Sequence, residues 1–472
     1  MKNEGERFTV NSQAIPCCAA ADLVVAGGGA AGFGAALAAA RQGLKVIIVE
    51  REFALGGIMT SGLMSKIAIS LMIDGIPREV IARLAEQKMA LPASRIEVPV
   101  DPEATKLLLE EMLLAENVRI MLGNMVVGAV EQDGQLQAVV VENKSGCQAI
   151  AGKVFIDATG DGDLATRAGA QFKSGREEDG LCSAPTLMFR VYNADLEQTM
   201  AYLDAHPEDM RSEYSQFPKT PAELRERYFA PSQKYCHFAT FAGLIDKVSS
   251  ERRFSDWELR VLKQRGIIFM NQPNPNQVLV NTTRIPNFHG GDAQELSDAM
   301  IEGRKQAHFI HQFMKEYIPG FENSFIMDTA NILGVRESRR ITGDYIFTED
   351  DVNGLARFDD AIVRNTGGTE IHNLTGNGTQ IKELPKGVWY DIPYRSILAK
   401  GFNNLLLAGR CFSATQNALS AARSIGFCMA MGEAAGTAAA LAIKQGVEIR
   451  KIPIVMLQRQ LGIEIEKSAL AE

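Results

Sequence analysis

The sequence predicts an α/β protein in which a mostly parallel sheet carries an antiparallel hairpin and is interrupted by an inserted α+β domain. Three observations predict this architecture. A glycine-rich turn joins a strand to a helix near residue 27, an Asp-Gly turn joins two strands at 133–134, and a buried strand with a small-residue helix returns after residue 403. The first is typical of a parallel nucleotide-binding sheet, and the second is a strong hairpin signal.

The N-terminal unit has the order strand, turn, helix, strand. The apolar run Leu23–Ala26 leads into the glycines as a buried parallel strand would. Alanine-rich residues from about Ala30 to Gln42 favour a helix that Gly43 ends, and Lys45–Glu50 (KVIIVE) indicates a second buried strand. This order is typical of a Rossmann-like unit, and it makes the glycine motif a specific signal.

Gly27, Gly29 and Gly32 have GxGxxG spacing within that unit, which predicts a site for the phosphates of a dinucleotide. Gly27 permits the tight bend, Gly29 lets the backbone approach the pyrophosphate, and Gly32 lets helix and strand pack closely. The phosphates would lie on the N-terminus of the helix, at Ala30 and Ala31. The alternative is a glycine-rich turn in an α/β protein that binds no nucleotide.

Glu50 ends the second strand, where a carboxylate can bind ribose hydroxyls. Because this carboxylate would repel a 2′-phosphate, the adenosine end belongs to NAD or FAD rather than NADP. Three further segments favour FAD, and with them the cofactor-binding candidates also include Arg51, Gly56, Gly57, Thr60, Val126, Ala158, Thr159, Gly160, Asp163, Gly409, Arg410, Ser424, Ile425 and Gly426.

The three segments differ in what they offer a flavin cofactor. The pair Gly56-Gly57 is not needed by a simple dehydrogenase, and it can bring backbone and hydroxyls close to an extended cofactor. DATGDGDLA, at 157–165, supplies small residues at a strand end for close backbone packing. Ser424–Gly426 would begin a small-residue helix whose positive end can stabilise charge on reduced flavin, although core packing alone is the alternative.

The remaining elements define the domain limits. Asp101-Pro102 begins a helix as N-cap and first residue, the strand 118–122 follows, and Asp133-Gly134 predicts the antiparallel hairpin. A further strand, 153–158, ends in ATGDGDLA, and from about residue 181 no regular strand–helix alternation is visible until NLLLAGR begins near 403. We therefore expect a discontinuous FAD-binding domain at 20–180 and 396–472, and a substrate or cap domain at 181–395.

A set of motifs carries a resemblance to a known family. They are VVAGGGAAGFGAALAAARQG, VIIVER with LGGIMTSGL, FIDATGDGDLA, NILGVRESRRITGDYIFTEDDV, IPYRSIL, LLLAGRCFSAT and GFCMAMGEAAGTAAALA. On these motifs, which span 22–446, the chain resembles the FAD-dependent oxidoreductases among the glutathione-reductase-like flavoproteins. The resemblance implies noncovalent FAD and redox chemistry, with diverse substrates. Because SIGF stands here where relatives more usually carry a methionine–proline pair, no substrate is transferred from them.

The catalytic candidates are His289, Arg336, His372 and Arg423. His289 (NFHGGD) and His372 (EIHNLTG) are expected in polar loops, where a general acid or base is often placed, although most loop histidines are merely solvated. Arg336 lies in GVRESRR, and Arg410 and Arg423 bracket the strand and helix expected near the flavin. Such arginines could bind an anionic substrate or the anionic reduced ring, or they could belong to an arginine–glutamate network that holds the cap.

We expect no metal site and no redox disulfide. His308 and His311 are three apart on an apparent helix but lack partnering Cys or acid signals, so a structural role is favoured. Cys411 and Cys428 flank the flavin segment without CxxC spacing, and nothing specific supports a covalent flavin link. The odd total of seven cysteines, with Cys17-Cys18 adjacent, is typical of reduced thiols.

Composition limits the class of protein. A chain of 472 residues suggests two or three domains, and 46% hydrophobic with 22% charged residues is typical of a globular protein. The net charge of −8 disfavours nucleic acid as a partner. The N-terminus lacks a signal-peptide pattern, and the apolar stretch 427–443 is shorter than a bilayer span and contains Glu433. We therefore expect no membrane span and a cytoplasmic location.

Together these features predict an FAD-dependent oxidoreductase that transfers a hydride between flavin N5 and a small organic substrate bound between the FAD and cap domains. No second GxGxxG follows a strand, so the electron donor or acceptor is open among oxygen, a quinone, a redox protein and NAD(P)H. The oligomeric state is open as well. The alternatives are a flavin monooxygenase or halogenase, and a protein that uses FAD in a non-redox, structural role.

Overall fold

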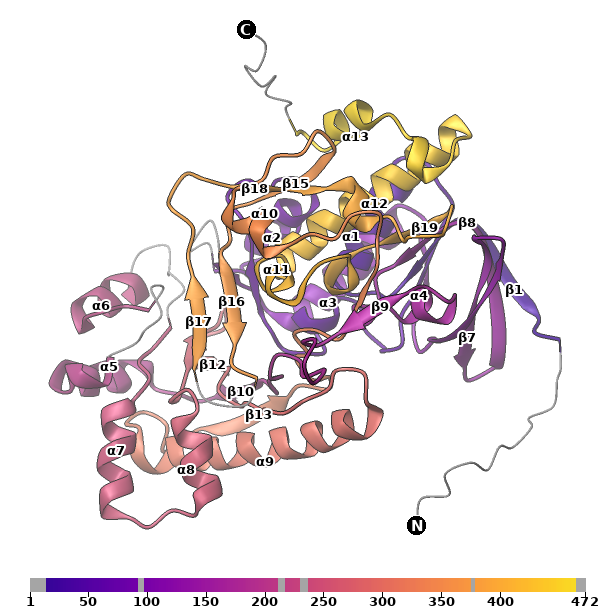
Figure 1. Cartoon of the computed structure of the whole chain (residues 1–472). Coiled ribbons are helices and arrows are strands. Elements are labelled where there is room, and N and C mark those ends of the chain that lie inside the picture. Colours follow the sequence, from indigo (N-terminus) through magenta and orange to yellow (C-terminus); the bar gives the residue numbers. More distant parts are fainter. Residues whose placement is uncertain (1–13, 92–96, 211–216, 230–236, 375–377, 464–472) are drawn as a thin grey trace, which may run out of the picture.

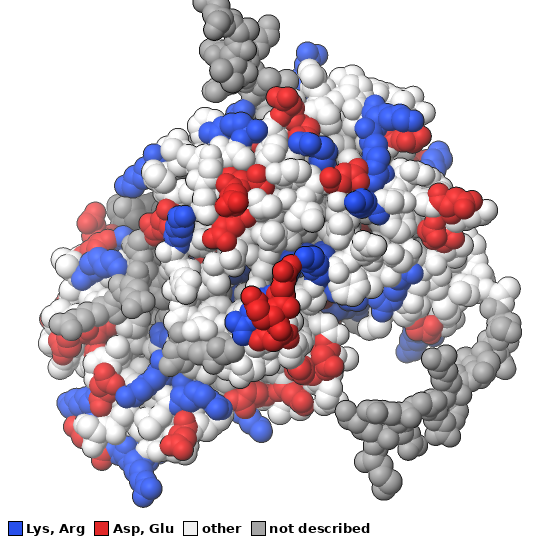
Figure 2. Space-filling view, in the orientation of Figure 1, with Lys and Arg blue, Asp and Glu red and all other residues white. Residues whose placement is uncertain are grey.

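The computed structural model describes residues 14–91, 97–210, 217–229, 237–374 and 378–463. Cys236 and residues 1–13, which include most of the segment considered for a signal peptide, lie outside these ranges. The other six cysteines are all free, as expected for reduced thiols. On the face drawn in Figure 2, basic and acidic side chains are interspersed, and the expectation that nucleic acid is not a partner stays a prediction.

A seven-stranded sheet carries the glycine-rich turn (Figure 1). Its strand order is β5 (Arg119–Met121), β2 (Val46–Val49), β1 (Cys17–Ala26), β8 (Gly146–Asp157), β7 (Gln135–Asn143) and β6 (Met125–Gln132), with β19 (Leu405–Leu407) also paired to β8. The strands β5, β2, β1, β8 and β19 are parallel, and Val25 lies between Ile48 and Ile156. The predicted Rossmann-like sheet is confirmed, including the return of the chain near residue 405.

Two details of this sheet test the local predictions. β1 begins earlier than predicted, because Cys17 to Ala21 pair with β8 although CCAAA has no strongly apolar run. β6 and β7 form the predicted hairpin. Asp133 and Gly134 have φ angles of 54° and 77°, both positive, as the favoured two-residue hairpin turn requires.

Two small-residue helices, α1 (Ala30–Arg41) and α12 (Ile425–Gln445), pack backbone to backbone beside this sheet (Figure 1). A Cβ on Gly432 would lie 1.9 Å from the Ala31 carbonyl oxygen, and one on Gly436 would lie 2.1 Å from the Ala35 carbonyl oxygen. Since real Cβ atoms do not approach so closely, the alanine and glycine content of α12 is a requirement of packing.

The helix α12 also corrects an expectation. Its 21 residues and mean hydropathy of 1.4 make it long and apolar enough to cross a bilayer, whereas the sequence suggested a shorter segment. It is the one such helix in the described ranges, and 89% of its apolar window is buried inside the protein. Burial of this kind is typical of a core helix.

The insertion forms an antiparallel sheet with its own core. Its strand order is β11 (Phe269–Asn271), β12 (Gln277–Val280), β10 (Phe189–Tyr192) and β13 (Phe325–Thr329). The long helix α9 (Ala293–Tyr317) runs along this sheet in Figure 1. The other helices are α5 (Leu196–Ala205), α6 (Pro221–Phe229), α7 (Ala242–Glu251) and α8 (Asp256–Lys263). The expected α+β character of this region is therefore present.

Shorter elements complete the fold. The helices are α2 (Ile76–Glu86), α3 (Pro102–Ala115), α4 (Asp163–Arg167), α10 (Glu349–Asn353), α11 (Gln416–Ala421) and α13 (Ile454–Gln460). The paired strands are β3 (Lys66–Ala68) with β4 (Glu97–Pro99), β9 (Phe172–Ser174) with β14 (Arg339–Ile341), β15 (Ala361–Asn365) with β18 (Tyr390–Pro393), and β16 (Thr369–His372) with β17 (Thr379–Lys382).

Two of these elements bear on the predictions. α3 begins where Asp101-Pro102 predicted, and Asp101 Oδ1 accepts a hydrogen bond from the Ala104 N–H at 2.8 Å. Within the segment assigned to the cap, the buried Ile341, Val363 and Ile392 pack into the core of the main sheet. The division into 20–180 with 396–472 and 181–395 stays a prediction.

Candidate active site

The predicted phosphate turn leaves no room for side chains at two of its glycines. Gly27 has a φ of +96°, and a Cβ there would lie 2.4 Å from the Ala158 carbonyl oxygen. A Cβ on Gly32 would lie 1.8 Å from the Gly27 carbonyl oxygen. The first glycine is therefore fixed by backbone conformation and contact with β8, and the second by the close approach of helix and strand, as the spacing predicted.

Gly29 is different, because a Cβ placed on it would meet no described atom within 4 Å. Its φ of −69° is open to any residue, so neither backbone conformation nor protein packing demands glycine here. It is the N-cap of α1, where no described side chain caps the first turn. Open space and a positive helix end that no described side chain caps together fit the diphosphate of a dinucleotide.

The pair Gly56-Gly57 packs directly on this turn. The Gly56 N–H donates to the Gly28 carbonyl at 2.8 Å, and a Cβ on Gly57 would lie 3.2 Å from Gly29 Cα. Thr60 is buried, and its hydroxyl donates to the Leu55 carbonyl at 2.5 Å. The second glycine pair therefore extends the small-residue surface that begins at the phosphate turn.

Glu50 braces the phosphate turn through its carboxylate. Its Oε2 accepts from the Gly28 N–H at 2.6 Å, and its Oε1 accepts from the Glu52 N–H at 2.9 Å. Burial raises the pKa of Glu50, and these two donors oppose the rise. The neighbouring Arg51 is more exposed, with Nη1 3.9 Å from Asp161 Oδ2. Ribose binding by Glu50 stays a prediction, and the support of the turn is a role that sequence reasoning missed.

Asp157, at the end of β8, orders the next segment. It is fully buried, and its Oδ1 accepts from the Thr159 N–H at 3.0 Å and from the Thr159 hydroxyl at 2.7 Å. Its Oδ2 accepts from the Ala165 N–H at 2.8 Å, while burial raises its pKa. Ala158, Thr159 and Gly160 are thereby held beside Gly27. Asp157 was not among the predicted site residues, although its place at a strand end was visible.

The comparisons with known proteins decide the family. The model of the FAD-dependent oxidoreductase family matches residues 22–461, nearly the whole chain. The protein belongs to this family. It is therefore an FAD-dependent enzyme of the oxidoreductase class, and the predicted cofactor is confirmed. A search among curated proteins found no match.

Solved structures similar to this FAD-dependent oxidoreductase include enzymes of several kinds. A geranylgeranyl bacteriochlorophyll reductase-like protein from Thermoplasma acidophilum has 11% identity and a TM-score of 0.47, over 94% of this chain and 82% of that chain. A p-nitrophenol 4-monooxygenase from Pseudomonas putida has 12% identity and a TM-score of 0.43, over 92% and 82%. An L-proline dehydrogenase from P. horikoshii has 11% identity and a TM-score of 0.40, over 95% and 99%. These values assign no substrate.

Arg410 packs against Gly160, in the predicted FAD-binding segment 157–165. A Cβ on Gly160 would meet Arg410 Nη2 at 2.5 Å, and the same nitrogen lies 3.2 Å from Asp161 Oδ1. Arg410 Nη1 is buried without a hydrogen-bond partner among the described residues. Such a donor fits an anionic or carbonyl acceptor of the cofactor. Gly409, with a φ of +82°, brings this segment to Ala31.

Asp161 ties that arginine to the loop before β14. Its Oδ1 also accepts from the Ser338 hydroxyl at 2.7 Å, and its carbonyl accepts from Arg339 Nε at 2.7 Å. Burial acts to raise the pKa of Asp161, but Arg410, the Ser338 hydroxyl and further arginines outweigh it and lower the pKa. Asp163 Oδ1 accepts from Arg339 as well. These two acids therefore fix arginines beside the FAD segment.

The N-terminus of α12 carries no cap from a described side chain, so its positive end is available to a negative charge. Ser424 is its N-cap, and no described side chain caps the first turn at Ile425. A Cβ on Gly426 would lie 2.7 Å from Ile69 Cβ, so this glycine lets β3 and its following loop pack on the helix end. A helix end of this kind favours negative charge. Val126, in contrast, is a buried β6 residue paired with Val141.

Beside this helix end lies a charged cluster made of Arg336, Glu370, His372 and Arg423. Arg423 directly precedes the N-cap of α12, and its Nη2 donates to the Glu370 carbonyl at 3.4 Å. Glu370 Oε1 lies 3.3 Å from His372 Nε2. Arg336 Nη1 donates to the Ala184 carbonyl, and Arg336 and Glu370 act electrostatically on one another. The structure therefore brings together three of the four catalytic candidates.

Glu370 keeps much of its side chain accessible at this cluster, and we infer an internal space there. Protein surrounds the residue, yet its side chain keeps 45% of its accessible surface. Both observations hold if that surface faces the interior rather than the outside of the molecule. Burial acts to raise the pKa of Glu370, but His372, Arg423 and Arg265 outweigh it and lower the pKa. Glu370 is therefore ionised at neutral pH, and sequence reasoning missed it.

The expectation that His372 lies in a polar loop is wrong. It ends strand β16 and is 3% exposed, because the pairing of β16 with β17 encloses it. Its Nδ1 lies 3.1 Å from the Thr379 hydroxyl. Burial and Arg336 hold the pKa of His372 well below its usual range, against the effect of Glu370. The neutral imidazole can therefore donate to Glu370 through one nitrogen while Thr379 donates to the other.

His289 and His311 have contacts outside this cluster, whereas His237 is buried and acts electrostatically on Glu370. His289 is in a loop, as expected, with Nδ1 2.9 Å from Glu295 Oε1 and Nε2 3.2 Å from the Asp179 carbonyl. Its bond to Glu295 raises its pKa. His311 contacts the Ser324 hydroxyl, and in the described ranges no group of three or more His, Cys, Asp or Glu residues could hold a metal ion.

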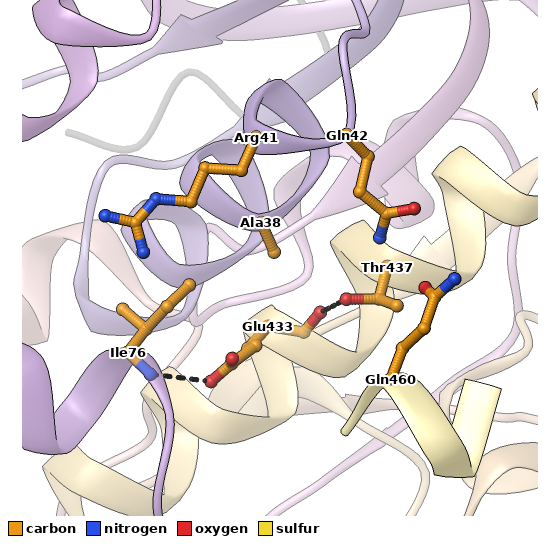
Figure 3. A pocket seen from close by; sticks show the side chains of 7 residues that line it. All are labelled: Ala38, Arg41, Gln42, Ile76, Glu433, Thr437 and Gln460. Atoms are coloured by element: carbon orange, nitrogen blue, oxygen red, sulfur yellow. Dashed lines mark hydrogen bonds between the residues drawn. The ribbon is translucent and has the colours of Figure 1, made fainter. Parts of the chain in front are cut away.

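A separate cavity of about 320 Å³ lies at the far end of α1 (Figure 3). Its lining residues are Ala38, Arg41, Gln42, Ile76, Glu433, Thr437 and Gln460. Glu433 Oε2 accepts from the Ile76 N–H at 3.0 Å, so it caps α2 from α12. The phosphate turn lies at the opposite end of α1, roughly 15 Å along the helix. This cavity is therefore not the FAD site.

Proposed function

We propose that this FAD-dependent oxidoreductase holds its cofactor noncovalently and transfers a hydride between flavin N5 and a small organic substrate. The observation that carries the proposal is the internal surface of Glu370. That surface lies next to the open N-terminus of α12, through the bond from Arg423, and carries an ionised carboxylate where a substrate could reach it. A carboxylate that keeps accessible surface beside a neutral imidazole is in a position to exchange a proton with a substrate.

The residues around this space have separate tasks in the proposal. FAD, when bound, supplies the hydride chemistry. Glu370 accepts the proton of a substrate hydroxyl or amine as the adjacent carbon loses a hydride, and it returns that proton in the reverse reaction. His372 orients the carboxylate and stabilises its charge. Arg336 and Arg423 orient the substrate.

Anaerobic reduction of the purified protein tests the proposal. We expect a yellow protein whose flavin is bleached by dithionite and by at least one organic donor, with FAD released when the protein is denatured. Flavin that stays with the denatured chain would overturn the noncovalent attachment. Flavin that no donor or acceptor can reduce or oxidise would overturn the redox role and favour a structural one.

The reaction of the reduced enzyme with oxygen distinguishes a monooxygenase from an enzyme that only transfers a hydride. A transient absorbance typical of an oxygen adduct at flavin C4a would favour a monooxygenase and contradict simple hydride transfer. We propose that reoxidation leaves no such transient. The cytoplasmic location remains part of the proposal, and fractionation of the cells that make the protein tests it.

A further inference from the structure

Arg336 and Arg423 bring two guanidinium groups to the internal space beside Glu370. Their hydrogen bonds go to backbone carbonyls, of Ala184 and of Glu370 itself. A carbonyl oxygen satisfies a donor but does not neutralise its charge. Burial and the neighbouring arginines lower the pKa of both groups, yet a guanidinium stays protonated at any physiological pH. The space is therefore lined by two positive charges held in place by neutral acceptors.

The acids of this region balance those charges only in part, because Glu370 offsets one of the two guanidinium charges and leaves the other without a counter-charge. Glu370 is paired with His372, whose imidazole is neutral at physiological pH. Glu337 is ion-paired with Arg340 at 3.1 Å and also accepts from the Gln416 amide at 2.7 Å. Excess charge of one sign inside a protein is costly unless an opposite charge joins it.

A second pair of arginines strengthens the same field. Arg265 and Arg284 both act on Arg336 with the same sign. Arg265 and Arg423 are among the groups that hold Glu370 ionised. The local field therefore favours an anionic guest beside the carboxylate rather than a neutral one.

We propose that the substrate is a small carboxylic acid that bears a hydroxyl or amino group. Its carboxylate lies on Arg336 and Arg423, and its hydroxyl or amino group donates to Glu370. Planar guanidinium groups match a carboxylate through paired hydrogen bonds, and an ionised carboxylate such as Glu370 is an acceptor only. This inference rests on the proposed function, since it assigns the substrate of the same internal space.

The other candidate for the two arginines is the negative charge of the reduced cofactor. The 21-residue helix α12 already presents an uncapped N-terminus for that charge. Arg336 is anchored to Ala184, in the segment leading to β10 of the insertion, rather than to the main sheet. Arg336 is therefore held from the insertion rather than from the helix that would face the reduced ring.

Equilibrium titration of the FAD-loaded enzyme tests the substrate class without turnover. The probes are lactate and alanine, each with its neutral-headed amide, lactamide or alaninamide, followed through the flavin absorbance spectrum. We expect at least one acid to give a saturable shift and its amide to bind at least about tenfold more weakly, because only the acid pairs with the arginines. Arg336→Gln should raise the dissociation constant of that acid by about tenfold or more.

Controls separate binding from folding and from the proposed function. Arg304→Gln, on the exposed face of α9, should leave the dissociation constant unchanged. Arg336→Lys should restore part of the affinity, and every variant must keep the flavin content of the parent. Equal binding of acid and amide, no spectral shift with either acid, or an Arg336→Gln variant with parental affinity would overturn the substrate class. Dithionite and donor reduction would still decide the proposed function independently.

Discussion

The two halves of the active site are built in different ways. The phosphate end uses backbone: Gly27, Gly29 and Gly32 come from one turn, and Gly56-Gly57 packs directly upon it. The proposed substrate end uses side chains that converge from distant segments, with Arg336 before β14, Glu370 on β16 and Arg423 before α12. A backbone site leaves a local sequence pattern, whereas a site of converging side chains is defined only by the folded chain.

Some glycines of the phosphate turn are required by protein packing, whereas we expect Gly29 to be required only by the cofactor. The largest expected effect comes from a glycine that packing requires. Gly32→Ala places a Cβ 1.8 Å from the Gly27 carbonyl, and backbone cannot move aside as a flexible side chain can. We expect it to lower the free energy of unfolding by roughly 3 kcal/mol and to abolish FAD binding. Denaturant unfolding measures the first effect, and Gly29→Ala is the matched control that should fold normally. Equal stability of the two variants would show that packing does not distinguish Gly32 from Gly29.

Gly29→Val should remove the cofactor while sparing the fold. The new side chain enters space that no described atom occupies, at a φ of −69° that valine tolerates. We expect FAD affinity to fall by more than about 100-fold, since the side chain fills the approach to the diphosphate. Absorbance of released flavin measures the loss, and Gly291→Val, also in open space, is the control. Full flavin retention in Gly29→Val would show that the diphosphate lies elsewhere.

The contrast between a local backbone site and converging side chains explains which features could be predicted from the sequence. The sheet, the α1 turn, the hairpin at Asp133-Gly134 and the start of α3 depend on local rules of turns, caps and apolar runs, and they were predicted. The buried position of His372 depends on the pairing of β16 with β17, which EIHNLTG does not signal. Glu370 escaped prediction as well, because Arg423 is distant from it in the sequence and the contact with the nearby His372 depends on the fold.

Glu370→Gln should affect the substrate end alone. The amide keeps the shape of the side chain but loses the charge and the ability to accept a proton. We expect full flavin content and a rate of substrate-dependent flavin reduction lowered by about 100-fold. Stopped-flow absorbance measures the rate, and Glu295→Gln, beside the exposed His289, is the control. A parental rate in Glu370→Gln would exclude Glu370 as the proton acceptor.

The smallest effect concerns Glu433, which lies outside both halves of the site. Burial raises the pKa of Glu433 to about 7, whereas an unfolded glutamate titrates near 4.3. The folded state therefore holds a proton that the unfolded state has lost, and this contribution to stability disappears as pH rises through about 7. Glu433→Gln keeps an acceptor for the Ile76 N–H and cannot ionise.

The melting temperature of Glu433→Gln should exceed that of the parent by about 2 °C at pH 8.5, and the two should agree at about pH 4, below the unfolded pKa. Thermal unfolding at the two pH values measures the difference, with FAD content held equal. An advantage that is the same at both pH values would show that ionisation of Glu433 is not its cause.

A structure of the FAD-loaded enzyme with a bound carboxylic acid tests most directly whether the active site has these two halves, a phosphate end made of backbone and a substrate end made of side chains. The account predicts the diphosphate against the backbone of Gly29 and Ala30, the flavin ring at the N-terminus of α12, and the acid between Arg336 and Glu370. A cofactor whose diphosphate avoids the α1 turn, or whose ring lies out of contact with the space beside Glu370, would contradict it.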